Sequence, residues 1–228
     1  RRLAAQPGTE FYLKLDCRLL PDAESHNVIG ELRGEAPAEI VLVGAHLDSW
    51  DVGEGAHDDG AGCVQSIEAL RLVKQALGGR RPRRTLRAVL FMNEENGVRG
   101  GLTYAANAAR GPARHIAAIE SDAGGFTPRG FGIDLNGKRL PHLPEWRAML
   151  APYGLHHFRL GGGGVDITPL RPQGTVLIGL LPDSQRYFSH HHTETDVFET
   201  VNRRELELGA GALAALAYLL LEHGVAQP

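Results

Sequence analysis

Short apolar runs alternate along this sequence with segments of helical periodicity, and this alternation limits the fold more than any other feature. The apolar runs cover residues 39–43, 85–92, 116–120 and 176–180. Continuous hydrophobicity of this length is typical of strands inside a sheet that is covered on both faces. Apolar residues at helical spacing occupy residues 61–77, 102–110, 143–150 and 202–223. The alternation predicts an α/β layered fold with a largely parallel central sheet.

Two more strands are predicted upstream, at residues 11–19 and 25–32. At the other end of the chain, the last predicted helix has Asn202 as an N-cap and Gly224 as a C-terminal stop. The apolar part of that helix, residues 208–221, is too short to span a membrane and contains two glycines. No transmembrane segment is therefore predicted.

The composition fits a single domain over residues 1–228 and narrows the choice of partners. With 43% hydrophobic residues, the chain is long enough to form one packed core. A net charge of −3 provides no basic field, and the arginine-rich connector at 80–84 lacks supporting aromatics, so nucleic-acid binding is not predicted. The two cysteines, Cys17 and Cys63, imply no disulfide framework. A start at Arg1 without a signal-like segment predicts a piece of a longer protein.

Histidines and acids gather where three of the predicted strands end. These residues are His46, Asp48, Asp58, Asp59, Glu94, Glu95 and Asp122. In open α/β sheets, sites form outside the carboxyl ends of the strands, so the loops should bring these groups together. A crowd of carboxylates repels itself unless cations neutralise it, and imidazole with carboxylate is an ordinary ligand set for zinc. A late cluster at residues 189–196 offers a further histidine ligand.

Four motifs carry a family resemblance. GAHLDSWDVGEGAHDDGAG, NEENGVRGG, IESDAGGF and HHTETD occur in this order along the chain. Together they resemble the M28 family of co-catalytic zinc exopeptidases and, within it, the carboxypeptidase Q group. One HLD tripeptide alone is a weak signal, whereas four ordered motifs are specific. The resemblance implies a three-layer α/β sandwich in which helices flank a mixed, largely parallel central sheet.

The resemblance also implies a site for two zinc ions per chain. Asp58 would bridge the two ions. His46 and Asp122 would complete one ligand set, and Glu95 and His192 would complete the other. Each ion would then have three protein ligands and room for a shared water, as expected of a catalytic rather than a structural zinc site.

Two acids near the ligands are given chemical roles. Glu94 is the candidate general base, because adjacent acids on a loop point in different directions and Glu95 is already assigned to metal. Glu94 would take a proton from the shared water and deliver it to the leaving amine. Asp48, two residues after His46, would orient that imidazole from behind.

Three more aspartates are assigned from the resemblance. The bond between Asp58 and Asp59 is expected to be cis, which gives Asp59 a supporting role behind the ligands. Asp196 is expected to orient His192. Asp166 matches a segment that lines the substrate pocket in relatives, with a solvent-facing loop residue as the alternative.

The implied activity is hydrolysis of the amide bond of dipeptides or short peptides, outside the cell or in the periplasm, and a homodimer is compatible with it. Two alternatives stay open. The first is a single-zinc aminoacyl cyclotransferase of the same fold, and the second is a non-catalytic binding domain built on a peptidase fold. The complete set of ligand types argues against both.

Overall fold

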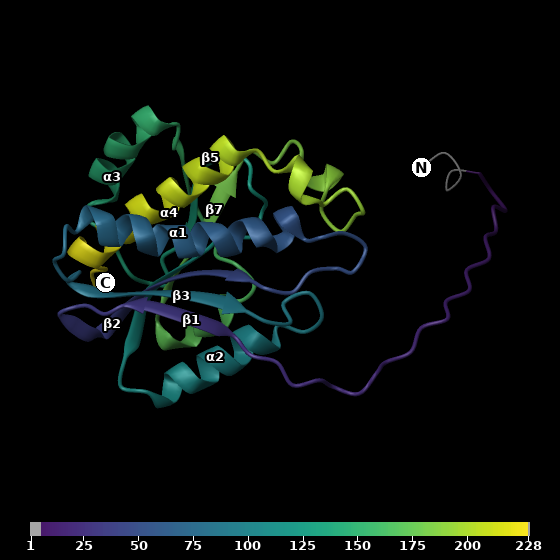
Figure 1. Ribbon diagram of the computed structural model, residues 1–228, viewed down its shortest axis with the longest axis horizontal. Coiled ribbons are helices and arrows are strands. Elements are labelled where there is room, and N and C mark those ends of the chain that lie inside the picture. Colours follow the sequence, from purple (N-terminus) through teal and green to yellow (C-terminus); the bar gives the residue numbers. More distant parts are fainter. Residues whose placement is uncertain (1–5, 228) are drawn as a thin grey trace.

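The computed structural model describes residues 6–227 and has three layers, with a sheet between two layers of helices (Figure 1). The 7-stranded sheet has the order β1-β3-β2-β4-β7-β5-β6. The strands are β1 Val28–Leu32, β2 Ala36–His46, β3 Arg84–Phe91, β4 Arg114–Glu120, β5 Pro128–Asp134, β6 His157–Leu160 and β7 Val176–Pro182. Strands β3, β2, β4 and β7 run parallel, whereas β1 and β5 are antiparallel to β3 and β7. The predicted mixed, largely parallel sheet is confirmed.

Parallel pairing brings the carboxyl ends of three strands to one edge of the sheet. In the register of β2 with β3, His46 lies beside Phe91. In the register of β2 with β4, Gly44 lies beside Glu120. The loops that follow these three strands therefore start next to one another, and they carry the predicted site residues.

Helices cover both faces of the sheet, and they are α1 Ala61–Ala76, α2 Arg99–Arg110, α3 Leu143–Leu150 and α4 Arg203–His223. Helices α1 and α4 lie side by side on one face, while α2 lies on the other (Figure 1). In β2, Val41 and Val43 belong to the core under α1 and α4, and Leu42 belongs to the core under α2. Both faces of the strand are buried, which explains why its sequence is apolar throughout. Short helical turns lie at Ala56–Gly60, Ala151–Tyr153, Thr168–Gln173, Tyr187–Ser189 and Phe198–Thr200.

Helix α4 has the predicted ends. The side chain of Asn202 accepts a hydrogen bond from the main-chain N–H of Glu205 at 3.1 Å, and Gly224 follows the last turn with a φ of 71°. By length and composition alone α4 could cross a membrane, but 56% of its apolar window is buried inside the protein. Packing against α1 and the sheet accounts for its hydrophobicity.

The strand predicted over residues 11–19 is wrong. Residues 9–27 form neither helix nor strand, and the first part of this segment extends away from the layered body before the chain returns to β1 (Figure 1). Phe11 is 89% exposed and Leu19 is 100% exposed. A strand is stabilised by hydrogen bonds to a neighbouring strand, and no strand in residues 6–227 pairs with residues 11–19.

Two strands were not predicted, β5 and β6. Strand β5 begins with a proline and contains Gly130 and Gly132, which are poor strand formers. Strand β6 is only 4 residues long, and most of its side chains are exposed at the edge of the sheet. Neither strand has a periodic apolar pattern strong enough to be recognised from the sequence.

Candidate metal centre

His46 lies at the end of β2 and faces two carboxylates. Its Nε2 atom is 3.2 Å from Asp58 Oδ1 and 3.4 Å from Asp122 Oδ1. Its Nδ1 atom lies 2.8 Å from the main-chain carbonyl of Asp48, which can only accept a hydrogen bond, so Nδ1 carries a proton. Burial opposes a charge on the ring, but the carboxylates of Asp122 and Asp58 outweigh it and raise the pKa of His46 well above its ordinary value. A cation, whether a proton or a metal, is therefore favoured between these groups.

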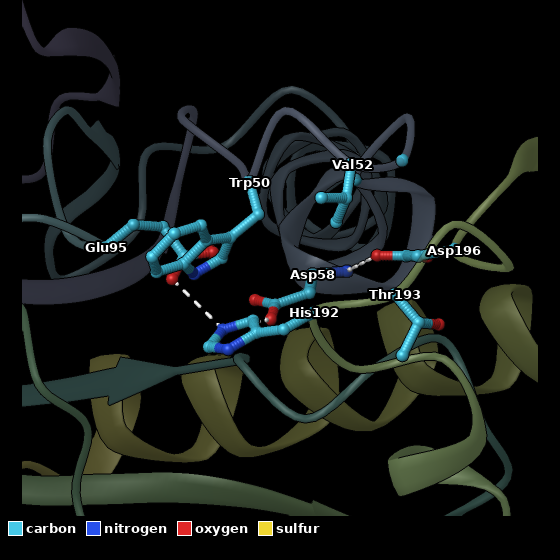
Figure 2. Close-up of a pocket in the computed structure, with 9 residues that line it drawn as sticks. Trp50, Val52, Asp58, Glu95, His192, Thr193 and Asp196 are labelled. Atoms are coloured by element: carbon cyan, nitrogen blue, oxygen red, sulfur yellow. Dashed lines mark hydrogen bonds and ion pairs between the residues drawn. The ribbon is translucent and has the colours of Figure 1, made fainter. Parts of the chain in front are cut away.

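His192 faces the other side of Asp58. Its Nε2 atom is 3.3 Å from Asp58 Oδ2 and 3.1 Å from Glu95 Oε2 (Figure 2). Asp58 thus presents one carboxylate oxygen to His46 and the other to His192. Asp58 Oδ2 and Glu95 Oε1 are buried without a hydrogen-bond partner. Such buried, unsatisfied carboxylate oxygens are costly unless a cation completes their surroundings.

The neighbouring His191 was not among the predicted ligands. Its Nε2 atom is 3.6 Å from Asp58 Oδ2, and its ring stacks on that of His192 with centroids 3.6 Å apart. The run of three histidines at residues 190–192 indicated that this loop supplies a ligand, but the spacing within the motif favoured His192 alone. The structure places two imidazoles of this loop beside the same oxygen.

Three overlapping groups of side chains in residues 6–227 have ligand atoms close enough to hold a metal ion. These groups are Asp58 with His191 and His192, His46 with Asp58 and Glu95, and His46 with Asp59 and Asp122. All five predicted ligands occur in them. The donor set consists of imidazole nitrogens and carboxylate oxygens, some of which lack a hydrogen-bond partner, and it fits zinc.

Asp48 and Asp59 support the centre through the main chain. The carboxylate of Asp48 accepts the N–H of Glu94 at 3.0 Å and that of Glu95 at 3.2 Å. Its own carbonyl, rather than its carboxylate, holds the imidazole of His46. Asp59 follows a cis bond from Asp58, as expected.

The carboxylate of Asp59 accepts hydrogen bonds from main-chain amides. Its oxygens accept hydrogen bonds from the N–H groups of His46 at 3.2 Å and Gly62 at 3.0 Å. These two hydrogen bonds hold the end of β2 against the start of α1.

Asp196 was expected to orient His192, but its buried carboxylate contacts a different segment. It accepts the main-chain N–H of His57 at 2.6 Å and that of Asp58 at 3.0 Å (Figure 2). The loop that supplies His192 thereby also fixes the backbone beside Asp58. This arrangement links the two sides of the centre.

Two further acids lie around the centre. Burial is the largest cause that raises the pKa of the half-buried Glu94, and the carboxylates of Asp122, Glu95 and Asp58 raise it further. Asp166 is 1% exposed, and neither of its carboxyl oxygens has a hydrogen-bond partner. Burial, together with the charges of Glu94 and Asp122, raises the pKa of Asp166 to about 7. Asp166 is therefore not a solvent-facing residue, and its contact with substrate stays a prediction.

Comparison with known proteins identifies the family. Residues 27–217 match Peptidase family M28. The chain is 36% identical over 211 residues to carboxypeptidase Q from Bos taurus, and this similarity covers 92% of the chain and 44% of the bovine protein. The chain thus spans less than half the length of this relative.

Solved structures agree with the sequence comparison. A crystal structure of a peptidase M28 precursor from Shewanella amazonensis SB2B matches with a TM-score of 0.75 at 35% identity, covering 89% of this chain and 46% of that one. BSAP, a zinc aminopeptidase from Bacillus subtilis, matches with a TM-score of 0.67 at 21% identity, covering 86% of this chain and 50% of that one, which shows a shared fold. Both the sequence and the fold lead to the same conclusion: this chain belongs to peptidase family M28.

Proposed function

We propose that this domain is the catalytic part of a metallopeptidase that uses two zinc ions to hydrolyse the amide bond of dipeptides or short peptides. The observation that carries the proposal is the position of Asp58, whose two carboxylate oxygens face two separate imidazoles at 3.2 Å and 3.3 Å. A carboxylate in this position can be shared by two cations. Family membership and the similarity to carboxypeptidase Q support peptide hydrolysis.

The proposed ligand sets are those that the family resemblance implies, and the distances around Asp58 support them. His46 and Asp122 would complete the first, and Glu95 and His192 would complete the second. When bound, zinc ions would polarise the scissile carbonyl and lower the pKa of bound water to about 7. The protein's own contribution is to hold the ligands rigidly, since they lie at strand ends or on a loop fixed by buried hydrogen bonds.

Glu94 is the proposed general base. Its carboxylate is free of hydrogen bonds to residues 6–227, while its main-chain N–H is fixed by Asp48. The pKa of Glu94 is raised toward neutral pH. A group that takes and then returns a proton works best when its pKa lies near the working pH. Glu94 would accept a proton from the attacking water and donate it to the leaving amine.

Metal content tests this proposal against its alternatives. Elemental analysis would count the zinc ions per chain, and dipeptide hydrolysis would be followed before chelation, after chelation and after zinc is returned. Two zinc ions with zinc-restored hydrolysis are the expected result. One zinc with cyclisation of an aminoacyl substrate would favour the cyclotransferase, and no metal after zinc addition would favour the non-catalytic binding domain. Location outside the cell or in the periplasm and a homodimeric assembly stay predictions.

A further inference from the structure

The loop between β3 and α2 carries the proposed general base, Glu94, and a proposed metal ligand, Glu95. A cavity of about 590 Å³ lies behind this loop, and Asn93 and Asn96 of the loop line it. Packed side chains therefore give the loop little support on this side. Hydrogen bonds hold it instead, and the side chain of Asn27 makes two of them.

Asn27 lies one residue before β1 and bonds to both ends of the loop. Its Oδ1 atom accepts the main-chain N–H of Met92 at 3.0 Å. Its Nδ2 atom donates to the carbonyl oxygen of Gly100, also at 3.0 Å. Because Val28 pairs with Leu90 in the antiparallel register of β1 with β3, the side-chain amide of Asn27 continues this pairing beyond the end of β3.

The two ends of the loop also contact each other at this point. The main-chain N–H of Gly100 donates to the carbonyl oxygen of Met92 at 2.9 Å. A Cβ atom on Gly100 would come within 2.5 Å of Asn27 Oδ1, so only glycine leaves room for the contact. Residues 93–99 therefore form a loop whose ends are joined by hydrogen bonds, and the side chain of Asn27 lies across those ends.

Two residues inside the loop have a disfavoured main-chain conformation. Asn93 has a φ of 67° and Val98 has a φ of 55°. Positive φ is uncommon for residues other than glycine, and for a β-branched residue such as valine it is an outlier. Such conformations persist only where the surrounding structure holds them. The hydrogen bonds of Asn27 end on the residues that flank this segment, so they support the loop where the disfavoured conformations lie.

Asp48 holds a different part of the same loop. Its carboxylate accepts the main-chain N–H groups of Glu94 and Glu95. Asp48 thus fixes the acidic pair directly, whereas Asn27 fixes the two ends of the loop. Within residues 6–227, the side chain of Asn27 forms hydrogen bonds only with those ends. Its effect on the acidic pair therefore passes through the main chain of the loop.

We propose that Asn27 is a positioning residue that sets where the carboxylates of Glu94 and Glu95 lie. The inference rests on the proposed function and adds to it a residue that lies outside all four sequence motifs. A small displacement of a reacting group costs rate even when the substituted residue is remote from the chemistry. Because Asn27 acts on the placement of the general base and not on the substrate, its loss should lower kcat and leave KM nearly unchanged.

The test is hydrolysis of alanyl-alanine by the zinc-loaded Asn27→Ala variant, with kcat expressed per folded molecule. We expect kcat to fall by about 10–100-fold, the usual cost of losing a group that supports a metal site, with KM within about twofold of the wild type. The matched control is Asn107→Ala, which removes an exposed asparagine of α2 and should behave as the wild type. Wild-type kcat in Asn27→Ala would overturn the proposal.

A second variant separates positioning from folding. Asn27→Asp keeps the size of the side chain and the acceptor for Met92, but it turns an oxygen toward the carbonyl of Gly100, where the wild type has a donor. This variant should also lose kcat at nearly unchanged KM, and it carries the test if Asn27→Ala does not fold. Circular dichroism gives the folded fraction of each variant. A loss of activity that only follows the unfolded fraction would show a structural role alone and overturn the proposal.

Hydrogen exchange distinguishes this inference from the proposed function, because it requires no activity. With zinc present, the amides of Met92, Glu94 and Glu95 should exchange faster in Asn27→Ala than in the wild type, while those of α1 should not change. If no peptide is hydrolysed but this difference is seen, the peptidase proposal fails and the positioning role of Asn27 stands. If both proteins hydrolyse peptides equally and exchange alike, the positioning role fails and the peptidase stands.

Discussion

The carboxylate of Asp48 accepts the main-chain N–H of Glu94 at 3.0 Å. Its second oxygen accepts the N–H of Glu95 at 3.2 Å. One side chain after β2 therefore fixes the loop after β3, where the proposed general base and a proposed ligand are adjacent. Its action on the reaction passes through the position of that loop, so we regard Asp48 as a positioning residue.

Replacement of Asp48 tests this relationship. Asp48→Ala leaves the two amides without their acceptor, and we expect kcat to fall by about 10–100-fold, the usual cost of losing a group that supports metal ligands. The matched control is Asp51→Ala, which removes an exposed aspartate of the same loop. Steady-state kinetics with zinc analysis would check the prediction. Wild-type kcat in Asp48→Ala would show that the loop keeps its position without this side chain.

Glu94 and Glu95 are adjacent residues with different proposed roles, and matched substitutions distinguish the general base from the metal ligand. Glu94→Gln should lower kcat by about 10²–10⁴-fold, the usual contribution of a general base, and keep the full zinc content. Glu95→Gln should lower the zinc content, because Glu95 Oε2 lies 3.1 Å from the imidazole of His192. Zinc loss in Glu94→Gln with retention in Glu95→Gln would reverse the two assignments.

The parts of this fold that the sequence predicts are those with strong local signals. The run around Val41 to Val43 is apolar because both faces of β2 are buried, and Asn202 caps α4 through a side-chain contact that spans only three residues. The segment at residues 11–19 also alternates, but alternation cannot show whether a partner strand is present. Strand β6 is held at the sheet edge by pairing with β5 and not by its own composition.

The metal centre, too, could be predicted only in part from the sequence. The ligand types were visible in the four ordered motifs, and His46, Glu95 and Asp122 also lie at or just after the end of an apolar strand. The long-range supports were not, because they join residues far apart in the chain. Asp196 binds the amides of His57 and Asp58 across a sequence separation of 139 and 138 residues, and no local pattern encodes such a contact. The approach of His191 to Asp58 likewise depends on how that loop folds back.

Bound metal should stabilise the fold in addition to supporting catalysis. Asp58 Oδ2 and Glu95 Oε1 are buried without a hydrogen-bond partner, so removing the cations leaves carboxylates that repel one another. Zinc at one hundred times its Kd should add about 2.7 kcal/mol to the free energy of unfolding per site, and chelation should lower Tm accordingly. Differential scanning fluorimetry with and without chelator would measure this shift.

Two variants show whether that shift comes from the proposed centre. Glu95→Gln should shrink the zinc-dependent rise in Tm. Glu199→Gln, which changes an exposed acid outside the centre, should leave it intact. A full zinc-dependent shift in Glu95→Gln would mean that zinc stabilises the protein from another place.

His115 gives the fold a dependence on pH that is independent of the metal centre. Arg87 Nη1 lies 2.8 Å from the hydroxyl oxygen of Tyr104, which lies 2.7 Å from His115 Nε2. Arginine can only donate, so the tyrosine hydroxyl donates to the imidazole and the ring is neutral. Burial, with the charge of Arg87, lowers the pKa of His115 to about 4.

Because the folded-state pKa of His115 lies below the unfolded value, its contribution to stability is complete above pH 6.5 and is lost as the pH falls from 6.5 toward 4. The loss should reach roughly 3 kcal/mol at the acid end. Urea unfolding of the chelated protein, in which metal release plays no part, would measure it as a function of pH. In His115→Gln the free energy of unfolding should fall less steeply over this window. The exposed His156 is the matched control, and His156→Gln should follow the wild type. Parallel curves for His115→Gln and the wild type would show that protonation of this imidazole costs the fold nothing.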